Sequence, residues 1–254
     1  MKQASKIVAI FMAVVSVFLL VGCQSSAPEE VYDGMVYTYN KDNTSYTLKS
    51  CESVVYNPTI DKVNGLPVTT VGERAFAGPN GEFLQTVTFG DSVKTIERQA
   101  FFYSPKLNYI TFGNGIQVIG EEAFGDCDSL VSLNIPDSVL EIDDRAFYIC
   151  DDQLRHVNIG KQLVTLGDEV FEGCLKLAYI NLPITIRNIG SGVFDECESL
   201  QYVYYEGTAE DWAKVNVEDE NDILLAHLYF YSQEQPQTSG RYWHYNDEGK
   251  RVIW

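Results

Sequence analysis

Four cysteines recur along the chain at spacings of 23, 24 and 23 residues: Cys127, Cys150, Cys174 and Cys197. A thiol can act as a nucleophile, a disulfide partner or a metal ligand, so this spacing is compatible with three kinds of chemistry. A stacked repeat would string the thiols along a line, whereas a zinc site needs ligands that converge on one point. Ser104 and Pro79 take the same place in earlier copies of the pattern, so we expect free thiols packed in the core rather than obligate disulfides.

The sequence contains no catalytic motif. Its three histidines are His156, His227 and His244, and it has no G-x-S-x-G, H-E-x-x-H, G-x-x-x-x-G-K-[ST] or G-x-G-x-x-G segment. A Cys–His pair could supply a nucleophile and its base, but cysteines that face a core are expected to be inert. We therefore expect no enzymatic activity and no cofactor.

Acidic residues gather in groups that could bind calcium. These are Asp126 with Asp128, Asp143 with Asp144, Asp151 with Asp152, and Glu218, Asp219 and Glu220 with Asp222. Calcium takes six or more oxygen ligands at one place, and no D-x-[DN]-x-[DN]-G loop is present to supply them. Solvated turns explain these acids better, so we predict no metal site.

The overall charge is strongly negative. The chain has 36 Asp and Glu against 18 Lys and Arg, which gives a formal net charge of −18. Nucleic-acid binding depends on a basic surface that neutralises phosphates, so a nucleic-acid partner is not expected. The hydrophobic content of 45% is typical of a globular protein.

The first residues have the layout of a secretory signal. Two lysines precede an apolar run from Ile7 to Val21, which is shorter than the ~20 residues that a membrane-spanning helix needs. The segment Leu20-Val21-Gly22-Cys23 resembles a bacterial lipobox. The resemblance implies removal of residues 1–22, acylation of Cys23, a polar tether over 23–30, and anchoring by lipid at the extracellular face of the cell envelope. The alternative is an ordinary signal peptide, or an uncleaved anchor that ends in Cys23.

The four periodic cysteines and His156 lie in a repeating frame. A Phe that follows Ala or Val recurs at spacings of 25, 23, 23, 24 and 23 residues: Phe76, Phe101, Phe124, Phe147, Phe171 and Phe194. After each Phe comes the phrase L-x-x-[VIL]-x-[FILY], from Leu84–Phe89 to Leu200–Tyr205. Such a period, with a short alternating strand in each copy, is typical of leucine-rich repeats, whose stacked copies bury a continuous core. We expect the strands to pair as a parallel sheet, and each Phe to point inward from a short helical or 3₁₀ turn.

The copies resemble the BspA-type bacterial leucine-rich repeat. Its pattern I-x-x-x-A-F-x-x-C-x-x-L stands here as Ile119 to Leu130, and the resemblance covers about residues 60–205. The flanking stretches resemble the caps that close such domains. We therefore predict a leucine-rich-repeat solenoid, a β-rich right-handed coil with a parallel sheet and short helical or 3₁₀ turns, capped at both ends. It forms one domain over 31–254, with an N-terminal β cap over 31–65, about six repeats over 66–205 and a C-terminal cap over 206–254.

The outward side of the strands is the candidate binding surface. One outward column reads Thr86, Tyr109, Ser132, His156, Tyr179 and Tyr202, and the next reads Thr88, Thr111, Asn134, Asn158, Asn181 and Tyr204. Charge is nearly absent and tyrosine is frequent, as in the cores of binding interfaces. We predict ligand binding by Tyr109, Asn134, His156, Asn158, Tyr179, Asn181, Tyr202 and Tyr204. The alternative is that Thr and Tyr stand there because they favour strands.

The family resemblance implies a cell-surface binding module that adheres to a host extracellular protein, a mucin or another bacterium. The expected partner is an extracellular protein or a glycan, with membrane contact only through the N-terminal lipid. Two other functions stay open: a structural or self-associating envelope protein, and a glycan-capturing lipoprotein beside a transporter. Fold alone does not choose among them, because one fold hosts many functions.

Overall fold

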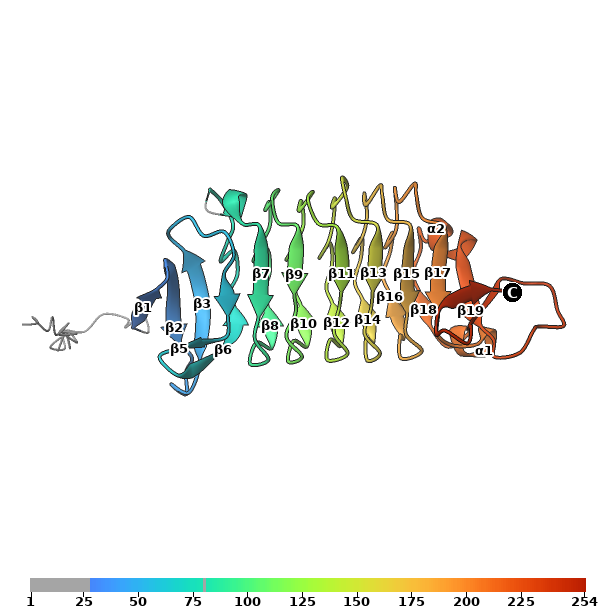
Figure 1. Ribbon diagram of the computed structural model, residues 1–254, viewed down its shortest axis with the longest axis horizontal. Helices are drawn as coiled ribbons and strands as arrows, with labels where there is room; N and C mark the ends of the chain where they lie inside the picture. Colours follow the sequence, from blue (N-terminus) through green and yellow to red (C-terminus); the bar gives the residue numbers. More distant parts are fainter. Residues whose placement is uncertain (1–27, 80) are drawn as a thin grey trace, which may run out of the picture.

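The computed structural model describes residues 28–79 and 81–254. These residues wind into a β-solenoid whose short strands lie side by side, in sequence order, along the long axis of the molecule (Figure 1). The predicted solenoid with parallel strands is therefore confirmed. The helices found in this part of the chain are too short and too polar to span a bilayer.

Two walls of the solenoid are built from hydrogen-bonded strands. The first wall is an eleven-stranded sheet of β1 (Glu29–Tyr32), β2 (Met35–Tyr39), β3 (Tyr46–Cys51), β5 (Lys62–Val63), β6 (Leu66–Val71), β8 (Thr95–Ile96), β10 (Val118–Ile119), β12 (Glu141–Ile142), β14 (Thr165–Leu166), β16 (Asn188–Ile189) and β18 (Asn216–Val217). The second wall begins as a three-stranded sheet of β4 (Thr59–Ile60), β7 (Thr86–Phe89) and β9 (Tyr109–Thr111). It continues as a seven-stranded sheet of β11 (Ser132–Asn134), β13 (His156–Asn158), β15 (Tyr179–Leu182), β17 (Tyr202–Tyr205), β19 (Leu228–Tyr231), β20 (Tyr242–Tyr245) and β21 (Arg251–Ile253). The described residues also form a 3₁₀ helix, η1 (Gly81–Phe83), and two α-helices, α1 (Ala209–Trp212) and α2 (Asp222–Ala226).

Strands of the repeats pair in parallel, in the register that the sequence period predicts. In the second wall His156 pairs with Ser132 on one side and with Tyr179 on the other. In the first wall Ile96 pairs with Ile119. Among the described strands, antiparallel pairing is confined to the two ends, in β1–β2, β2–β3, β5–β6 and β20–β21. These terminal strands cover the ends of the core, which would otherwise meet water.

A column of phenylalanine rings runs through the core. The rings stack with centroid separations of 4.7, 5.0, 5.5, 5.5 and 5.8 Å along Phe76, Phe101, Phe124, Phe147, Phe171 and Phe194. All six side chains are buried, which confirms that the repeat Phe points inward. Aromatic pairs at such distances add about 0.5–1.5 kcal/mol each beyond the burial of their area. The column therefore couples every turn of the solenoid to the next.

Each inward Phe stands on a hydrogen-bonded turn, where the sequence predicted short helical or 3₁₀ turns. A non-glycine residue of the turn takes a positive φ, with values of 51° at Glu122, 55° at Arg145 and 55° at Glu169. This backbone conformation is unfavourable for L-residues. Bonds between turns offset the cost, as where the N–H of Phe101 donates to the carbonyl of Ala123 at 2.8 Å. The stacked turns form a third wall, which we call the turn wall.

The four periodic cysteines are buried free thiols, as the sequence predicts. Each thiol donates to the backbone carbonyl of the Phe in the preceding turn. The Sγ–O distances are 3.5 Å for Cys127–Phe101, 3.3 Å for Cys150–Phe124, 3.3 Å for Cys174–Phe147 and 3.1 Å for Cys197–Phe171. Burial raises the pKa of the Cys197 thiol to about 12, so the reactive thiolate is suppressed. The cysteine column therefore contributes to packing and to the bonding between turns.

Carboxylates of the turn wall also bond one turn to the next. Oδ1 of Asp144 accepts the N–H of Asp168 at 2.8 Å, and Oδ1 of Asp168 accepts the N–H of Ser191 at 2.8 Å. A Cβ added at Gly167 would lie 2.4 Å from Oδ1 of Asp144, so glycine is what lets the carboxylate approach. The structure thus gives Asp144 a structural role beyond the solvated turn that the sequence predicts.

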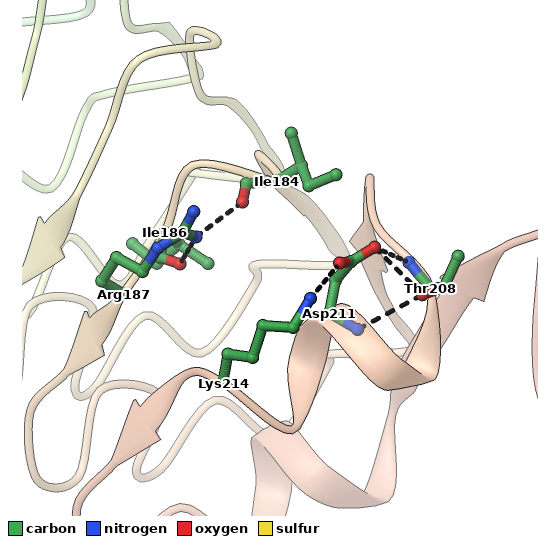
Figure 2. Close-up of polar contacts among 6 residues, drawn as sticks. All are labelled: Ile184, Ile186, Arg187, Thr208, Asp211 and Lys214. Atoms are coloured by element: carbon green, nitrogen blue, oxygen red, sulfur yellow. Dashed lines mark hydrogen bonds and ion pairs between the residues drawn. The ribbon is translucent and has the colours of Figure 1, made fainter.

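The C-terminal cap is fixed by local polar contacts (Figure 2). At the start of α1, the N–H of Asp211 donates to Oγ1 of Thr208 and the N–H of Thr208 donates to Oδ2 of Asp211, both at 3.2 Å. Hydrogen bonds from Lys214 and Thr208 lower the pKa of Asp211 to about 2. Arg187 donates to two backbone carbonyls of the loop before it, at 2.8 and 2.7 Å. These contacts fix the start of α1 and the conformation of the loop before β16.

Candidate ligand-binding face

The second wall presents the two outward columns that the sequence predicts. Buried residues alternate with half-buried ones along β7, β13 and β17. The pairing registers place Tyr202 beside Tyr179, and Tyr179 beside His156. Hydroxyl, phenol, amide and imidazole groups thus line this surface, which we call the strand face.

Tyr109 lies toward the N-terminal part of the strand face. It belongs to β9, and 55% of its surface is exposed. Its register partner in β7 is Thr86, and the next strand, β11, begins a new sheet with Ser132. Tyr109 is therefore separated from the aromatic residues of β13, β15 and β17.

A strip of contacting side chains occupies the middle of the strand face. The rings of His156 and Tyr179 stack with a centroid separation of 4.2 Å. Burial and the charge of Arg155 lower the pKa of His156, so its imidazole is neutral at physiological pH. In the next column, Nδ2 of Asn158 donates to Oδ1 of Asn134 at 3.0 Å. These contacts order neutral groups for binding and place His156 against a ring rather than a nucleophile.

Asn181 corrects the prediction made for the second column. Its side chain is 2% exposed. Oδ1 accepts the N–H of Ile159 and Nδ2 donates to the carbonyl of Ile159, both at 2.9 Å. The amide takes the place of backbone bonds between β13 and β15, so Asn181 holds the wall together and does not face a ligand.

The strand face becomes more aromatic toward its C-terminal end. The rings of Tyr202 and Tyr204 stack at 5.6 Å. Tyr229 of β19 lies 5.5 Å from Tyr202 and 6.2 Å from Tyr204, and Trp243 of β20 meets Tyr204 edge-on at 5.6 Å. Tyr229 therefore extends the predicted surface, while Trp243, which is fully buried, packs against Tyr204.

A pocket of about 470 Å³ lies beside these rings, lined by Tyr179, Tyr204, Tyr245, Gly249, Lys250 and Arg251. The guanidinium of Arg251 packs over the rings of Tyr204 and Trp243, at 5.7 and 5.8 Å from their centroids. It also pairs with Glu206 at 3.7 Å, and burial raises the pKa of that carboxyl. The hairpin of β20 and β21 thus brings two cations to a surface that the repeat strands leave uncharged.

Sequence reasoning missed the residues of this pocket that come from the cap. A signal was present, because Leu228 to Tyr231 and Tyr242 to Tyr245 alternate in the same way as the strands of the repeats. From the sequence, both segments are assigned to the C-terminal cap over 206–254 and given no binding role. The predicted lipidation site, Cys23, lies outside the described residues.

Three aspartates outside the strand face lie close to one another. Asp128, Asp151 and Asp152 offer carboxylate oxygens within 4.8 Å of one another. Burial and the neighbouring acids raise the pKa of Asp128 to about 6. Three such ligands are fewer than the six or more oxygens that calcium takes, and they repel one another.

Solved structures similar to this chain are bacterial leucine-rich-repeat proteins. A leucine-rich repeat protein from Bacteroides ovatus matches with a TM-score of 0.61 and 23% identity over 79% of this chain and 55% of its own. A leucine rich cell surface protein from Faecalibacterium prausnitzii matches with a TM-score of 0.58 and 21% identity, over 91% of this chain and 62% of its own. The T. pallidum leucine rich repeat protein matches with a TM-score of 0.53 and 28% identity, over 68% of this chain and 91% of its own. This chain thus spans about half of the Bacteroides protein, and no curated protein matches it.

The family model described as BspA type leucine rich repeat region matches six copies, over residues 46–174 and 94–214. These ranges span most of the chain and coincide with the stacked turns of the solenoid. Such solenoids are typically scaffolds for binding. The chain therefore belongs to the BspA-type leucine-rich-repeat family.

Proposed function

We propose that this protein is a cell-surface binding module that adheres through its strand face to a host extracellular protein, a mucin or another bacterium. Acylation at Cys23 anchors it to the outside of the cell envelope in this proposal. The observation that carries the proposal is the strip from His156 to Tyr229, where uncharged aromatic and amide groups gather on a chain with a net charge of −18.

Interface physics supports this assignment. The cores of binding surfaces are depleted of charge and enriched in tyrosine. Side chains already held by stacking, such as Tyr202 on Tyr204, lose little conformational freedom when a partner binds. The description of the Faecalibacterium relative as a cell surface protein agrees with the proposed location.

The test is a binding screen of the purified full chain, in detergent, against matrix proteins, mucins, glycans and bacterial cells. A strand-face variant carries Tyr109→Ser, Tyr179→Ser and Tyr202→Ser. A control variant carries Tyr32→Ser, Tyr56→Ser and Tyr103→Ser. Tyr32 and Tyr56 lie in the N-terminal cap and Tyr103 in the turn wall, and they are 50%, 51% and 50% exposed. We expect a ligand whose affinity falls at least about tenfold, or 1.4 kcal/mol, in the strand-face variant and is unchanged in the control.

Two results would overturn the proposal. Equal binding by all three proteins would move recognition away from the strand face. No binding in the screen, together with concentration-dependent assemblies in light scattering, would instead support a self-associating envelope protein. A hit confined to glycans and lost after deglycosylation of the ligand would narrow the proposal to glycan capture.

A further inference from the structure

The pocket between the strand face and the last hairpin carries a more specific assignment. We propose that it binds an acidic sugar, a ring that bears a carboxylate. The inference rests on the proposed function, since it names the ligand class for the C-terminal end of the same face. It concerns residues of β15, β17 and the β20–β21 hairpin, which lie together at the C-terminal end of the solenoid (Figure 1).

The size of the pocket suits a small ligand. Its volume of about 470 Å³ lies within the range of about 300–1,000 Å³ that is usual for small-molecule sites. A second hollow of about 390 Å³, lined by Lys161, Glu206, Tyr231 and Trp243, shares Tyr245 with it. The first pocket by itself offers room for a terminal sugar.

The charge of the pocket suits an anion. Its lining carries two cations, Lys250 and Arg251, and no carboxylate, although acids outnumber bases two to one in the chain. Lys250 pairs with Glu248 at 2.8 Å, but both side chains are exposed, at 73% and 70%. Exposed ion pairs are weak because water screens them, so an incoming anion can readily displace this one.

The guanidinium of Arg251 has hydrogen-bond donors that the described residues do not use. A guanidinium offers five N–H donors in a planar fork. The ion pair with Glu206 spans 3.7 Å, which is longer than a hydrogen bond, and the enclosed Nε has no hydrogen-bond partner among the described residues. The rings of Tyr204 and Trp243 hold the fork in place. A carboxylate matches this fork with two parallel hydrogen bonds.

The remaining walls suit a sugar ring. Tyr179, Tyr204 and Tyr245 line the pocket with aromatic carbon, against which the C–H groups of a sugar can pack, and with hydroxyls that can bond its hydroxyls. Tyrosines are amphipathic and stiff, so they present this surface at low entropic cost. The combination of three phenols with two cations therefore favours the acidic sugar.

The test is isothermal titration calorimetry of the full chain with methyl β-glucuronide and methyl α-N-acetylneuraminide. Methyl β-glucoside is the neutral control, and an acetylated tri-glutamate amide represents an acidic peptide. We expect at least one acidic sugar to bind with a Kd on the order of 1 mM or tighter, and the neutral sugar to bind at least about tenfold more weakly.

Variants then locate the site. Lys250→Gln changes an exposed side chain and should leave folding intact, and Arg251→Gln removes the fork. Both should weaken binding of the acidic sugar at least about tenfold, while Lys176→Gln, an exposed lysine in the loop before β15, should not.

The outcomes separate this inference from the proposed function. Equal affinity for the neutral sugar, binding of the peptide in place of the sugars, or sugar binding that Lys250→Gln leaves unchanged would each overturn the inference. If no sugar binds while the strand-face variant still loses its partner in the screen, the inference fails and the proposed function stands. If the acidic sugar binds in a Lys250-dependent manner, the pocket assignment holds whatever the screen shows.

Discussion

The indole Nε1 of Trp243 donates a 2.9 Å hydrogen bond to the backbone carbonyl of Tyr205. Both side chains are fully buried, although Trp243 belongs to the final hairpin and Tyr205 to the last repeat strand. The bond joins the hairpin that carries Lys250 and Arg251 to the strand that carries Tyr202 and Tyr204. The shape of the pocket depends on this junction.

Replacement of the indole should therefore destabilise the C-terminal end. We expect Trp243→Phe to lower the free energy of unfolding by about 1–3 kcal/mol, because the Tyr205 carbonyl loses its partner in a buried site. Trp243→Ala should cost about 3–5 kcal/mol. Urea denaturation followed by circular dichroism measures both. Trp254→Phe is the matched control, since its Nε1 donates to the Ser232 carbonyl at 3.0 Å in an exposed place where water can replace it. Equal losses in Trp243→Phe and Trp254→Phe would contradict the proposed junction.

Ser104 takes the place of a cysteine in the column of buried thiols, and it puts a hydroxyl where the later repeats have a thiol. It is fully buried, and its hydroxyl has no hydrogen-bond partner within the part of the chain that the structure describes. An unsatisfied buried hydroxyl costs about 1–3 kcal/mol. Ser104→Ala and Ser104→Cys should therefore raise the free energy of unfolding by about 1 kcal/mol, measured by urea denaturation. A loss of stability in both variants would show that the hydroxyl is bonded in solution.

Replacement of two adjacent acids of the turn wall, Asp143 and Asp144, should have different effects on the stability of the protein. Asp144→Ala removes the acceptor for the N–H of Asp168 and should destabilise the protein by about 1–2 kcal/mol. Burial and the neighbouring Glu141 raise the pKa of Asp143 to about 6, so Asp143→Asn should leave stability at pH 7 unchanged or higher. Thermal unfolding of the two variants measures the contrast. Equal destabilisation by both would contradict the carboxylate bonding between turns.

Stability should rise as the pH falls from 7.5 to 5. Burial is the main cause that raises the pKa of Asp128 and Asp143 to about 6 and of Glu172 to about 7. Unfolded carboxyls have pKa values of about 3.9–4.3, so the folded state binds more protons between about pH 4 and 7. The unfavourable charged form of Glu172 is relieved as the pH falls through about 7, and those of Asp128 and Asp143 as it falls through about 6. The melting temperature should therefore increase across this range, and the combined variant Asp128→Asn, Asp143→Asn, Glu172→Gln should flatten the increase. A wild-type melting temperature that falls toward pH 5 would contradict this account.

Much of the fold follows from the spacing of Phe and Leu, because stacked copies put equivalent side chains above one another. The Phe column and the buried thiols were predictable for this reason. Asn181 was not, since an amide at an outward position can turn inward and replace a backbone bond only when the neighbouring strand leaves one open. Positive φ at Glu122 likewise depends on bonds from the next turn.

The pocket escaped prediction for a related reason. Its lining joins Tyr179 and Tyr204 to residues more than forty positions later, and no local pattern encodes how the final hairpin contacts the strand face. The buried Trp243 determines that contact through tertiary packing. Sequence could place the tyrosines of the repeats on one surface, and only the structure adds the cations beside them.

Hydroxyl-radical footprinting tests most directly whether the strand face is the recognition surface. Oxidation of each tyrosine is measured by mass spectrometry in the free chain and in the chain saturated with the partner found in the binding screen. Protection is expected at Tyr179 and Tyr202, while Tyr56 and Tyr103, which are 51% and 50% exposed and lie elsewhere, keep their rates. Protection of Tyr56 or Tyr103, with unchanged oxidation of Tyr179 and Tyr202, would contradict the account.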